Sequence, residues 1–300
     1  MNKASRRAQL LCSLPDLAHT LRLPDGRQLG YAEYGDPAGR PVFFFHGLPG
    51  SRLTLFSADA TAATLGLRMI APERPGYGLS DFQPGRTLLD WPADVARLAD
   101  ALQIERFAVI GLSGGGPHAL ACAATLPERL TRCLLICSLG PLCSPELIGA
   151  LPFSARLTYG MGRRVPFSLL QEVLRPVARR AAYSPEVLFP RMTCLLPRAD
   201  RLALRDPVIV ARMQESQAEA YRPGPAATAW ETLLLLRPWG FDLASIRIPV
   251  HLWHGALDRT VPIVLARALE RMLPDCTATY YPDEGHFLLY KHGAEILAAV

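Results

Sequence analysis

Short runs rich in apolar and β-branched residues recur along the chain and are typical of buried strands. They lie at His19–Leu23, Gln28–Tyr34, Val42–His46, Leu67–Ala71, Phe107–Leu112, Arg132–Cys137, Ile248–His254 and Thr277–Tyr281. The first two flank the turn sequence Pro24–Gly26, which predicts an opening hairpin. Val42–His46 is continuously apolar up to its last residue, as a central parallel strand should be.

Helical periodicity follows several of these runs. Thr87 and Asp90 have the spacing of a capping box and predict a helix that continues to Leu102. Further helices are predicted from Gly114 to Pro127, from Pro262 to Met272, and from Phe287 to the chain end. Because strands and helices alternate, the pattern predicts an α/β fold, with a mainly parallel sheet of the eight-stranded type and helices on both faces.

This alternation stops between residues 140 and 241. The segment is rich in proline and arginine, and its periodic pieces, Ser168–Arg180 and Pro207–Ala220, predict short amphipathic helices. We therefore predict a core domain made of residues 1–139 and 242–300, with residues 140–241 inserted as a helical cap, or lid.

Composition narrows the functional classes. Half of the 300 residues are apolar, enough for a sizeable buried core, but no apolar run reaches the roughly 18 residues of a membrane span. The net charge of +5 is modest, and basic residues do not gather with aromatic ones as nucleic-acid binding requires. We expect a small-molecule substrate, no nucleic-acid partner and no integral membrane segment.

The N-terminus and the cysteines indicate a cytoplasmic protein. Lys3, Arg6 and Arg7 precede an apolar stretch that is too short for a signal peptide and is interrupted by Gln9. The seven cysteines contain no CxxC pair, so they predict free thiols in a reducing compartment. No phosphate loop, dinucleotide fingerprint or metal cluster stands out, and we expect neither a cofactor nor a metal.

The candidate chemistry centres on Gly111-Leu112-Ser113-Gly114-Gly115, which matches the G-x-S-x-G nucleophile elbow. Such an elbow is a very sharp turn from strand to helix, and only small residues fit two positions before and after the serine. Here the motif lies between an apolar strand and a helix start, which is the context that the chemistry requires. Ser113 is therefore the candidate nucleophile.

Several motifs in order along the chain resemble the α/β-hydrolase superfamily. The resemblance covers roughly residues 19–140 and 240–300, and one departure is Glu73, where an aspartate is usual. The superfamily includes esterases, C–C hydrolases, proline iminopeptidases and epoxide hydrolases. The motifs are His46-Gly47-Leu48-Pro49-Gly50, Arg74-Pro75-Gly76-Tyr77-Gly78-Leu79-Ser80-Asp81, the elbow, Gly255-Ala256-Leu257-Asp258 and Glu284-Gly285-His286.

A serine hydroxyl needs a base and an acid to become nucleophilic, and in this fold they follow it as acid and then histidine. His286, after the last predicted strand, is the candidate base. Asp258, after the preceding strand, is the candidate acid, since Asp283 and Glu284 are too close in sequence to His286. Some relatives place the acid after the strand that here ends at Cys137, where this chain has none.

The resemblance also implies the oxyanion donors, which are the backbone N–H groups of Leu48 and Gly114. It assigns support of the elbow and of the oxyanion loop to Gly111, Gly115, His46 and Gly47. The Leu48–Pro49 bond is a candidate for the cis form. Two further expectations concern neighbouring side chains: Arg74 and Asp81 pair within their loop, and His118 lines the pocket.

These residues predict a serine hydrolase of a small, partly apolar molecule, with an ester favoured over a thioester, amide or activated C–C bond. Ser113 argues against the epoxide hydrolases and dehalogenases of the superfamily, which use aspartate at the elbow. A C–C hydrolase, an iminopeptidase-like peptidase and a perhydrolase remain alternatives. The alternative from another class is a ligand-sensing protein that keeps the fold without turnover.

The predicted cap carries most of the net charge. From Gly140 to Leu243 there are 13 arginines against 9 acidic residues, whereas the rest of the chain has 19 basic and 18 acidic residues. The excess predicts either a basic rim that steers anionic substrates or a solvated surface without catalytic effect.

Overall fold

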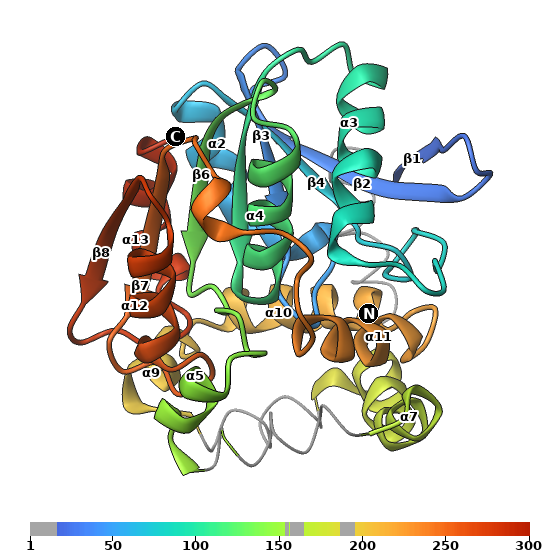
Figure 1. Cartoon of the computed structure of the whole chain (residues 1–300). Coiled ribbons are helices and arrows are strands. Elements are labelled where there is room, and N and C mark those ends of the chain that lie inside the picture. The colour runs from blue at the N-terminus through green and yellow to red at the C-terminus, as the bar shows by residue number, and fades with distance from the viewer. Residues whose placement is uncertain (1–16, 154–155, 157–164, 187–195) are drawn as a thin grey trace.

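The computed structural model describes residues 17–153, 156, 165–186 and 196–300. The predicted N-terminal features, together with Cys12 and Cys194, lie outside the described residues. A single eight-stranded sheet has the order β1-β2-β4-β3-β5-β6-β7-β8 (Figure 1). Its strands are β1 (His19–Arg22), β2 (Gln28–Gly35), β3 (Arg40–Phe45), β4 (Leu67–Pro72), β5 (Phe107–Leu112), β6 (Leu130–Ile136), β7 (Val250–Gly255) and β8 (Cys276–Tyr281).

Strand direction confirms the predicted class. β1 pairs with β2 and β2 pairs with β4 in antiparallel fashion, which confirms the opening hairpin. All pairs from β4 across to β8 are parallel. The observed first residue of each strand lies within two residues of the predicted one, because the apolar pattern is weakest at strand ends. The chain therefore has an α/β fold with a mainly parallel sheet.

Helices cover both faces of the sheet, as predicted. Side chains alternate along β3: Phe43 and Phe45 join one core cluster, and Val42 and Phe44 join the other. The first cluster packs beneath α3 (Trp91–Ala101), α4 (Gly116–Thr125) and α12 (Ile263–Met272). The second packs beneath α2 (Asp59–Thr64) and α13 (Leu289–Ala298).

Local signals set where the helices begin. Thr87 and Asp90 form the predicted capping box, with the Thr87 N–H and hydroxyl both 2.6–2.7 Å from Asp90 Oδ2. The box opens a short 3₁₀ turn, η2 (Leu88–Asp90), before α3 begins. Pro117 occupies the first turn of α4, where its missing N–H costs no hydrogen bond.

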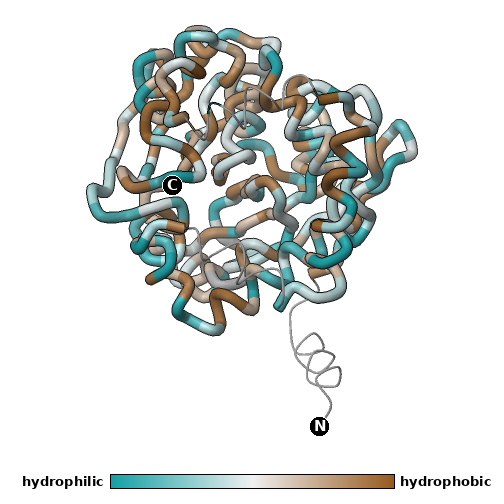
Figure 2. The backbone as a smooth tube through the Cα atoms, turned by 90° about the horizontal axis from the view of Figure 1, so that it is seen from below, coloured by the Kyte–Doolittle hydropathy of each residue, from teal (hydrophilic) through white to brown (hydrophobic). Residues whose placement is uncertain are grey.

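The described residues between β6 and β7 contain helices and no strand. We call residues 140–241 the cap segment. Its helices lie together at the end of the sheet where the parallel strands finish (Figure 1), and hydrophobic and hydrophilic stretches alternate along them (Figure 2). The division into core and cap domains stays a prediction. The helices are α5 (Pro145–Ala150), α7 (Phe167–Tyr183), α9 (Arg198–Ala203), α10 (Pro207–Ala220) and α11 (Ala226–Leu235), and the 3₁₀ turn η4 (Leu243–Ser245) follows them.

Two further observations concern the described part of the chain. None of its helices combines the length and the apolar character needed to cross a bilayer. Its five cysteines are all unpaired, and Cys122, Cys133 and Cys137 are buried.

Candidate active site

Ser113 lies at a sharp turn between β5 and α4. Its φ of +52° is in the left-handed region, which is uncommon for a residue other than glycine. The turn continues directly into the 3₁₀ turn η3 (Ser113–Gly115) and then into α4. Ser113 is thus presented at the N-terminal end of a helix, whose dipole favours negative charge nearby.

Close packing explains the glycines on either side of Ser113. A Cβ at Gly111 would lie 2.6 Å from Gly116 Cα, and a Cβ at Gly115 would lie 2.2 Å from the Phe45 carbonyl oxygen. Both are backbone atoms that cannot yield without moving a strand or a helix. The two glycines therefore allow the elbow to form, as the sequence predicted.

Asp258 and His286 are brought together from separate loops. Asp258 follows β7, His286 follows β8, and His286 Nδ1 is 2.7 Å from Asp258 Oδ2. The other carboxylate oxygen, Oδ1, accepts the backbone N–H groups of Thr260 and Val261, each at 2.8 Å. Asp258 is 5% exposed. The aspartate is therefore held in one orientation, and it in turn fixes the histidine ring.

Electrostatics favour an ion pair between these two groups. Burial alone would raise the pKa of Asp258, but the charge and hydrogen bond of His286 outweigh it and lower that pKa. Burial alone would lower the pKa of His286, but the charge and hydrogen bond of Asp258 raise it, with a smaller contribution from Asp200. The imidazolium is thus more stable here than in water.

The carboxyl groups next to His286 in sequence do not reach its ring. Asp283 is exposed. Glu284 instead pairs with Lys291 and His292. Of the candidate acids weighed in the sequence, Asp258 alone contacts His286 in the described structure.

Cys137 lies where some relatives would place the acid. Its thiol is buried, and donor atoms of Cys137, Asp258 and His286 lie within 4.8 Å of one another. Burial raises the pKa of the thiol well above its usual value, and its Sγ is 3.8 Å from the Gly285 carbonyl oxygen. Since both carboxylate oxygens of Asp258 already accept hydrogen bonds, the cluster is arranged as a hydrogen-bonded pair beside a neutral thiol.

The predicted oxyanion donors come from two backbone segments in contact. A Cβ added at Gly114 would lie 2.7 Å from Leu48 Cβ and 3.4 Å from Leu48 N. A Cβ added at Gly47 would lie 3.6 Å from Ser113 Cβ, so the loop runs directly past the serine. The Leu48–Pro49 peptide bond is cis.

Arg74 and His46 hold this loop. The Arg74 guanidinium donates to the carbonyl oxygens of His46 (2.6 Å) and Gly47 (3.1 Å), and His46 Nε2 accepts the Arg74 N–H. The predicted pairing of Arg74 with Asp81 is wrong. Arg74 forms a bidentate ion pair with Glu231 on α11, at 2.7 and 2.8 Å, in a fully buried position.

Other polar groups around this pair also differ from expectation. Asp81 instead accepts the Gln28 N–H at 2.8 Å. His118 is fully buried, with Nδ1 3.0 Å from the Gly114 carbonyl oxygen, so it does not line the pocket as predicted. Arg86 adds a second guanidinium to Glu231 at 2.7 Å.

A second buried ion pair links the sheet to the cap segment. Glu73, the residue that departs from the family pattern, accepts hydrogen bonds from the Arg52 guanidinium and the Leu79 N–H. The same guanidinium binds Glu219 on α10 at 2.5 Å. Burial raises the pKa of Glu73 to about 7, although Arg52 opposes the shift. Glu73 therefore organises the loop that carries Arg74.

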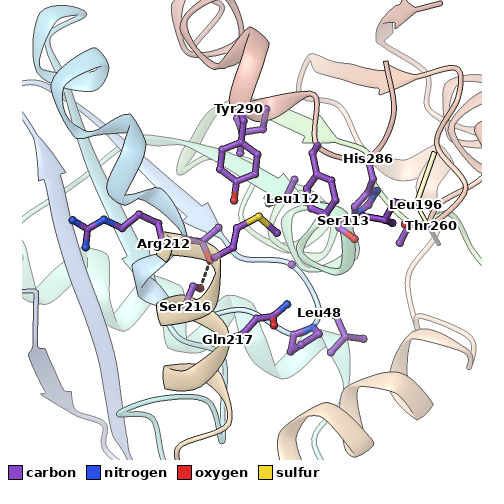
Figure 3. A pocket seen from close by; sticks show the side chains of 16 residues that line it. Leu48, Leu112, Ser113, Leu196, Arg212, Ser216, Gln217, Thr260, His286 and Tyr290 are labelled. Carbon is purple, nitrogen blue, oxygen red and sulfur yellow. Dashed lines mark hydrogen bonds between the residues drawn. The ribbon is translucent and has the colours of Figure 1, made fainter. Parts of the chain in front are cut away.

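Ser113 and His286 open onto one cavity of about 240 Å3 between the sheet and the cap segment (Figure 3). Its wall is mostly apolar, with Gln217 and Tyr290 among the polar members and Arg212 as the one arginine among the described lining residues. The lining comprises Gly47, Leu48, Pro49, Thr54, Leu112, Ser113, Leu196, Arg212, Met213, Ser216, Gln217, Thr260, His286, Phe287, Leu289 and Tyr290.

Two residues of this site, Glu231 and Asp200, could not be identified from the sequence. Glu231 lies in an apolar helical stretch, where a buried acid and an exposed one look the same. Asp200, on α9, is 1% exposed and accepts the Phe287 N–H at 3.0 Å, although the two residues are 87 positions apart in the chain. Both residues come from the cap segment, and their partners are long-range.

Curated relatives match the chain over different lengths. A non-heme chloroperoxidase of Streptomyces lividans is 35% identical over 41% of this chain, and the match spans only 45% of that relative. A 2-hydroxy-6-oxo-2,4-heptadienoate hydrolase of Pseudomonas putida is 25% identical over 84% of each chain. A pimeloyl-[acyl-carrier protein] methyl ester esterase of Aromatoleum aromaticum is 28% identical over 79% of this chain and 88% of its own.

Solved structures share the fold at low identity. A probable hydrolytic enzyme of Pseudomonas aeruginosa superposes with a TM-score of 0.73 at 18% identity, covering 96% of this chain and 93% of its own. A thermophilic esterase of Thermogutta terrifontis has a TM-score of 0.65 at 22% identity, covering 94% and 96%. The family described as alpha/beta hydrolase fold matches residues 40–293. The chain belongs to the α/β-hydrolase family.

Proposed function

We propose that this protein is a serine hydrolase that cleaves an ester bond of a small, partly apolar molecule. One observation carries the proposal: the strained Ser113 and His286, which is paired with Asp258, line the same cavity, beside the Leu48 and Gly114 backbone. Activated serine chemistry needs a nucleophile, a base, an acid and an oxyanion site in one place. The relatives named as hydrolases support the reaction class.

The mechanism assigns one step to each group. Ser113 Oγ attacks the substrate carbonyl carbon while its proton passes to His286 Nε2, and Asp258 stabilises the resulting imidazolium through Nδ1. The backbone N–H groups of Leu48 and Gly114 stabilise the negative oxygen of the tetrahedral intermediate. His286 then gives its proton to the leaving alcohol. Water repeats the sequence on the acyl-enzyme and releases the acid.

The cavity supports a small substrate. Sites for drug-sized ligands are about 300–1,000 Å3, so a cavity of about 240 Å3 favours a smaller molecule. Leu48, Leu112 and Met213 are apolar lining residues, whereas Gln217 and Tyr290 carry hydrogen-bonding groups toward the same space (Figure 3). A short acyl chain with one uncharged polar substituent fits this distribution.

A C–C hydrolase is the second candidate, because the Pseudomonas putida relative named for such a substrate matches 84% of each chain. Both reactions can use the same serine and histidine, so the leaving group distinguishes them. Thioester, amide, iminopeptidase-like and perhydrolase reactions are further alternatives of the same site. A ligand sensor would be acylated once at Ser113 and would keep the adduct.

The test is a panel of esters that vary in acyl length and leaving group, assayed beside a vinylogous 1,5-diketone as the C–C substrate. We expect steady turnover of short-chain esters, labelling of Ser113 by a fluorophosphonate, and no loss of activity with excess chelator. Ser113→Ala should lose at least about 1000-fold in kcat and all labelling, with Tm nearly unchanged. Preferential turnover of the diketone would move the assignment to C–C hydrolysis, and one stoichiometric acylation without turnover would favour the sensor.

A further inference from the structure

A second carboxylate approaches the His286 loop from the cap segment. Asp200 lies on α9, is 1% exposed, and accepts the Phe287 N–H at 3.0 Å through Oδ1. Its Oδ2 is buried and has no hydrogen-bond partner among the described residues. A buried oxygen without a partner costs free energy, so natural structures keep few of them. Asp200 is one of these exceptions, and it lies beside the candidate base.

Gly285 makes this approach possible. A Cβ at residue 285 would lie 2.3 Å from Asp200 Oδ1 and 2.6 Å from Oδ2. The carboxylate therefore occupies the space that a side chain would take immediately before His286. The glycine of the Glu-Gly-His sequence thus leaves room for a carboxylate of the cap segment that lies 85 positions earlier in the chain.

The charges around His286 show what Asp200 adds. Asp258 binds the ring directly, His254 Nε2 lies 3.8 Å from Asp258 Oδ2, and the Cys137 thiol lies within 4.8 Å of the donor atoms of Asp258 and His286. On the outer side, Glu284 is paired with Lys291 and His292. On α9 itself, Arg201 donates to the Leu196 carbonyl oxygen. Asp200, from the cap segment, adds its charge to that of Asp258 in raising the pKa of His286, although burial also raises the pKa of Asp200 itself.

The chain just before α9 also borders the substrate space. Leu196 lines the cavity, and Asp200 follows within about one helical turn of it. A molecule bound in the cavity would contact Leu196, four residues before the aspartate that accepts the Phe287 N–H. The cavity wall and the contact with the His286 loop are thus contributed by one short segment, residues 196–200.

We propose that Asp200 is a positioning residue, which holds the Gly285–Phe287 loop by its hydrogen bond and stabilises the His286 imidazolium by its charge. The inference rests on the proposed function, since the imidazolium forms when the Ser113 proton moves to Nε2. No bond to Asp200 forms or breaks. The residue lowers the free energy of the charged intermediate state and keeps Nε2 directed at the serine.

The experiment compares Asp200→Asn and Asp200→Ala with the matched control Asp206→Asn. Asp206 is also in the cap segment and also accepts a backbone N–H, that of Val208 at 2.8 Å, but it is exposed. The first measurement is the His286 imidazole titration by NMR of 13C-labelled histidine in the Ser113→Ala background. It requires no turnover, so it tests the inference even if the ester assignment fails. The second measurement is kcat and KM for a short ester.

Loss of the negative charge should lower the pKa of His286 by about 0.5 unit or more in Asp200→Asn. We expect kcat to fall roughly tenfold with KM within about twofold, and a larger loss in Asp200→Ala. Asp206→Asn should change neither quantity. A His286 pKa equal to that of the control would overturn the proposal, and so would a lowered Tm without that pKa shift, because Asp200 would then only stabilise the fold.

Gly285→Ala provides an independent variant from the other side of the contact. The added methyl group should displace Asp200 and reproduce the lowered His286 pKa while leaving the carboxylate in the chain. An unchanged titration in this variant would equally contradict the proposal.

Discussion

His286 Nδ1 is 2.7 Å from Asp258 Oδ2, although Glu284 lies only two residues from the histidine along the chain. The Glu284 side chain instead reaches Lys291 and His292. Asp258 comes from the loop after the neighbouring strand, β7. Sheet topology, and not proximity in sequence, therefore determines which carboxylate contacts His286.

Asp258→Asn should lower kcat by about 10⁴, because an amide cannot stabilise the imidazolium and favours the wrong tautomer of the ring. The measurement is steady-state kinetics with a short ester. Asp283→Asn and Glu284→Gln are the matched controls and should stay within about threefold of the wild type. An active Asp258→Asn beside an inactive Glu284→Gln would refute the assignment.

The pH profile should report the raised pKa of His286. The base must be neutral before it accepts the serine proton, so kcat/KM rises with pH as the imidazolium loses its proton. Because the pKa of His286 lies above its ordinary value of 6.5, the acidic limb of kcat/KM should have its midpoint above 6.5. A midpoint clearly below that value would show that burial outweighs the attraction of Asp258.

Glu231→Gln should lower the free energy of unfolding by about 3–5 kcal/mol, because it leaves the buried guanidinium of Arg74 without a counter-charge. Glu172→Gln is the control: it breaks an exposed pair with Arg175 on α7, and such pairs contribute about 0–1 kcal/mol. Urea denaturation of both variants makes the comparison. Equal losses of unfolding free energy in the two variants would mean that the buried pair stabilises the fold no more than the exposed one.

Salt dependence should decide whether the arginines of the cap segment act on substrates. If they form a steering rim, kcat/KM for a carboxylate-bearing ester falls several-fold from low to high salt, and that for a neutral ester does not. The structure makes the solvated-surface alternative the expected outcome, since Arg175, Arg212 and Arg222 each pair with a glutamate three residues away in the chain. We therefore expect parallel salt curves for the two esters, and divergent curves would establish a rim.

The alternation of strands and helices was predictable because the sequence pattern of each strand is local. A buried parallel strand needs a short apolar run, and Phe107–Leu112 shows it without help from distant residues. The elbow at Ser113 was predictable for the same reason, since its glycines are required by atoms of adjacent elements. The Asp258 and His286 positions follow from motifs at strand ends, where parallel topology brings such loops together.

Long-range polar partners were not predictable. Nothing near Arg74 in sequence indicates Glu231, and the acid that did lie nearby, Asp81, was the wrong partner. The contact depends on how α11 packs at the end of the sheet (Figure 1), which no local pattern of a single sequence encodes. Asp200 was missed for the same reason: an aspartate near the start of a short helix is ordinarily a solvated residue.

Arg74 serves two structures at once, since one guanidinium joins α11 through Glu231 and holds the His46 and Gly47 carbonyl groups of the proposed oxyanion loop. Exchange of the cap segment for that of another family member is therefore not a modular operation in this protein. A transplanted segment without an acid at the position of Glu231 would release the guanidinium and loosen the loop on which catalysis is proposed to depend. The cap segment and the proposed oxyanion loop must here evolve as one unit.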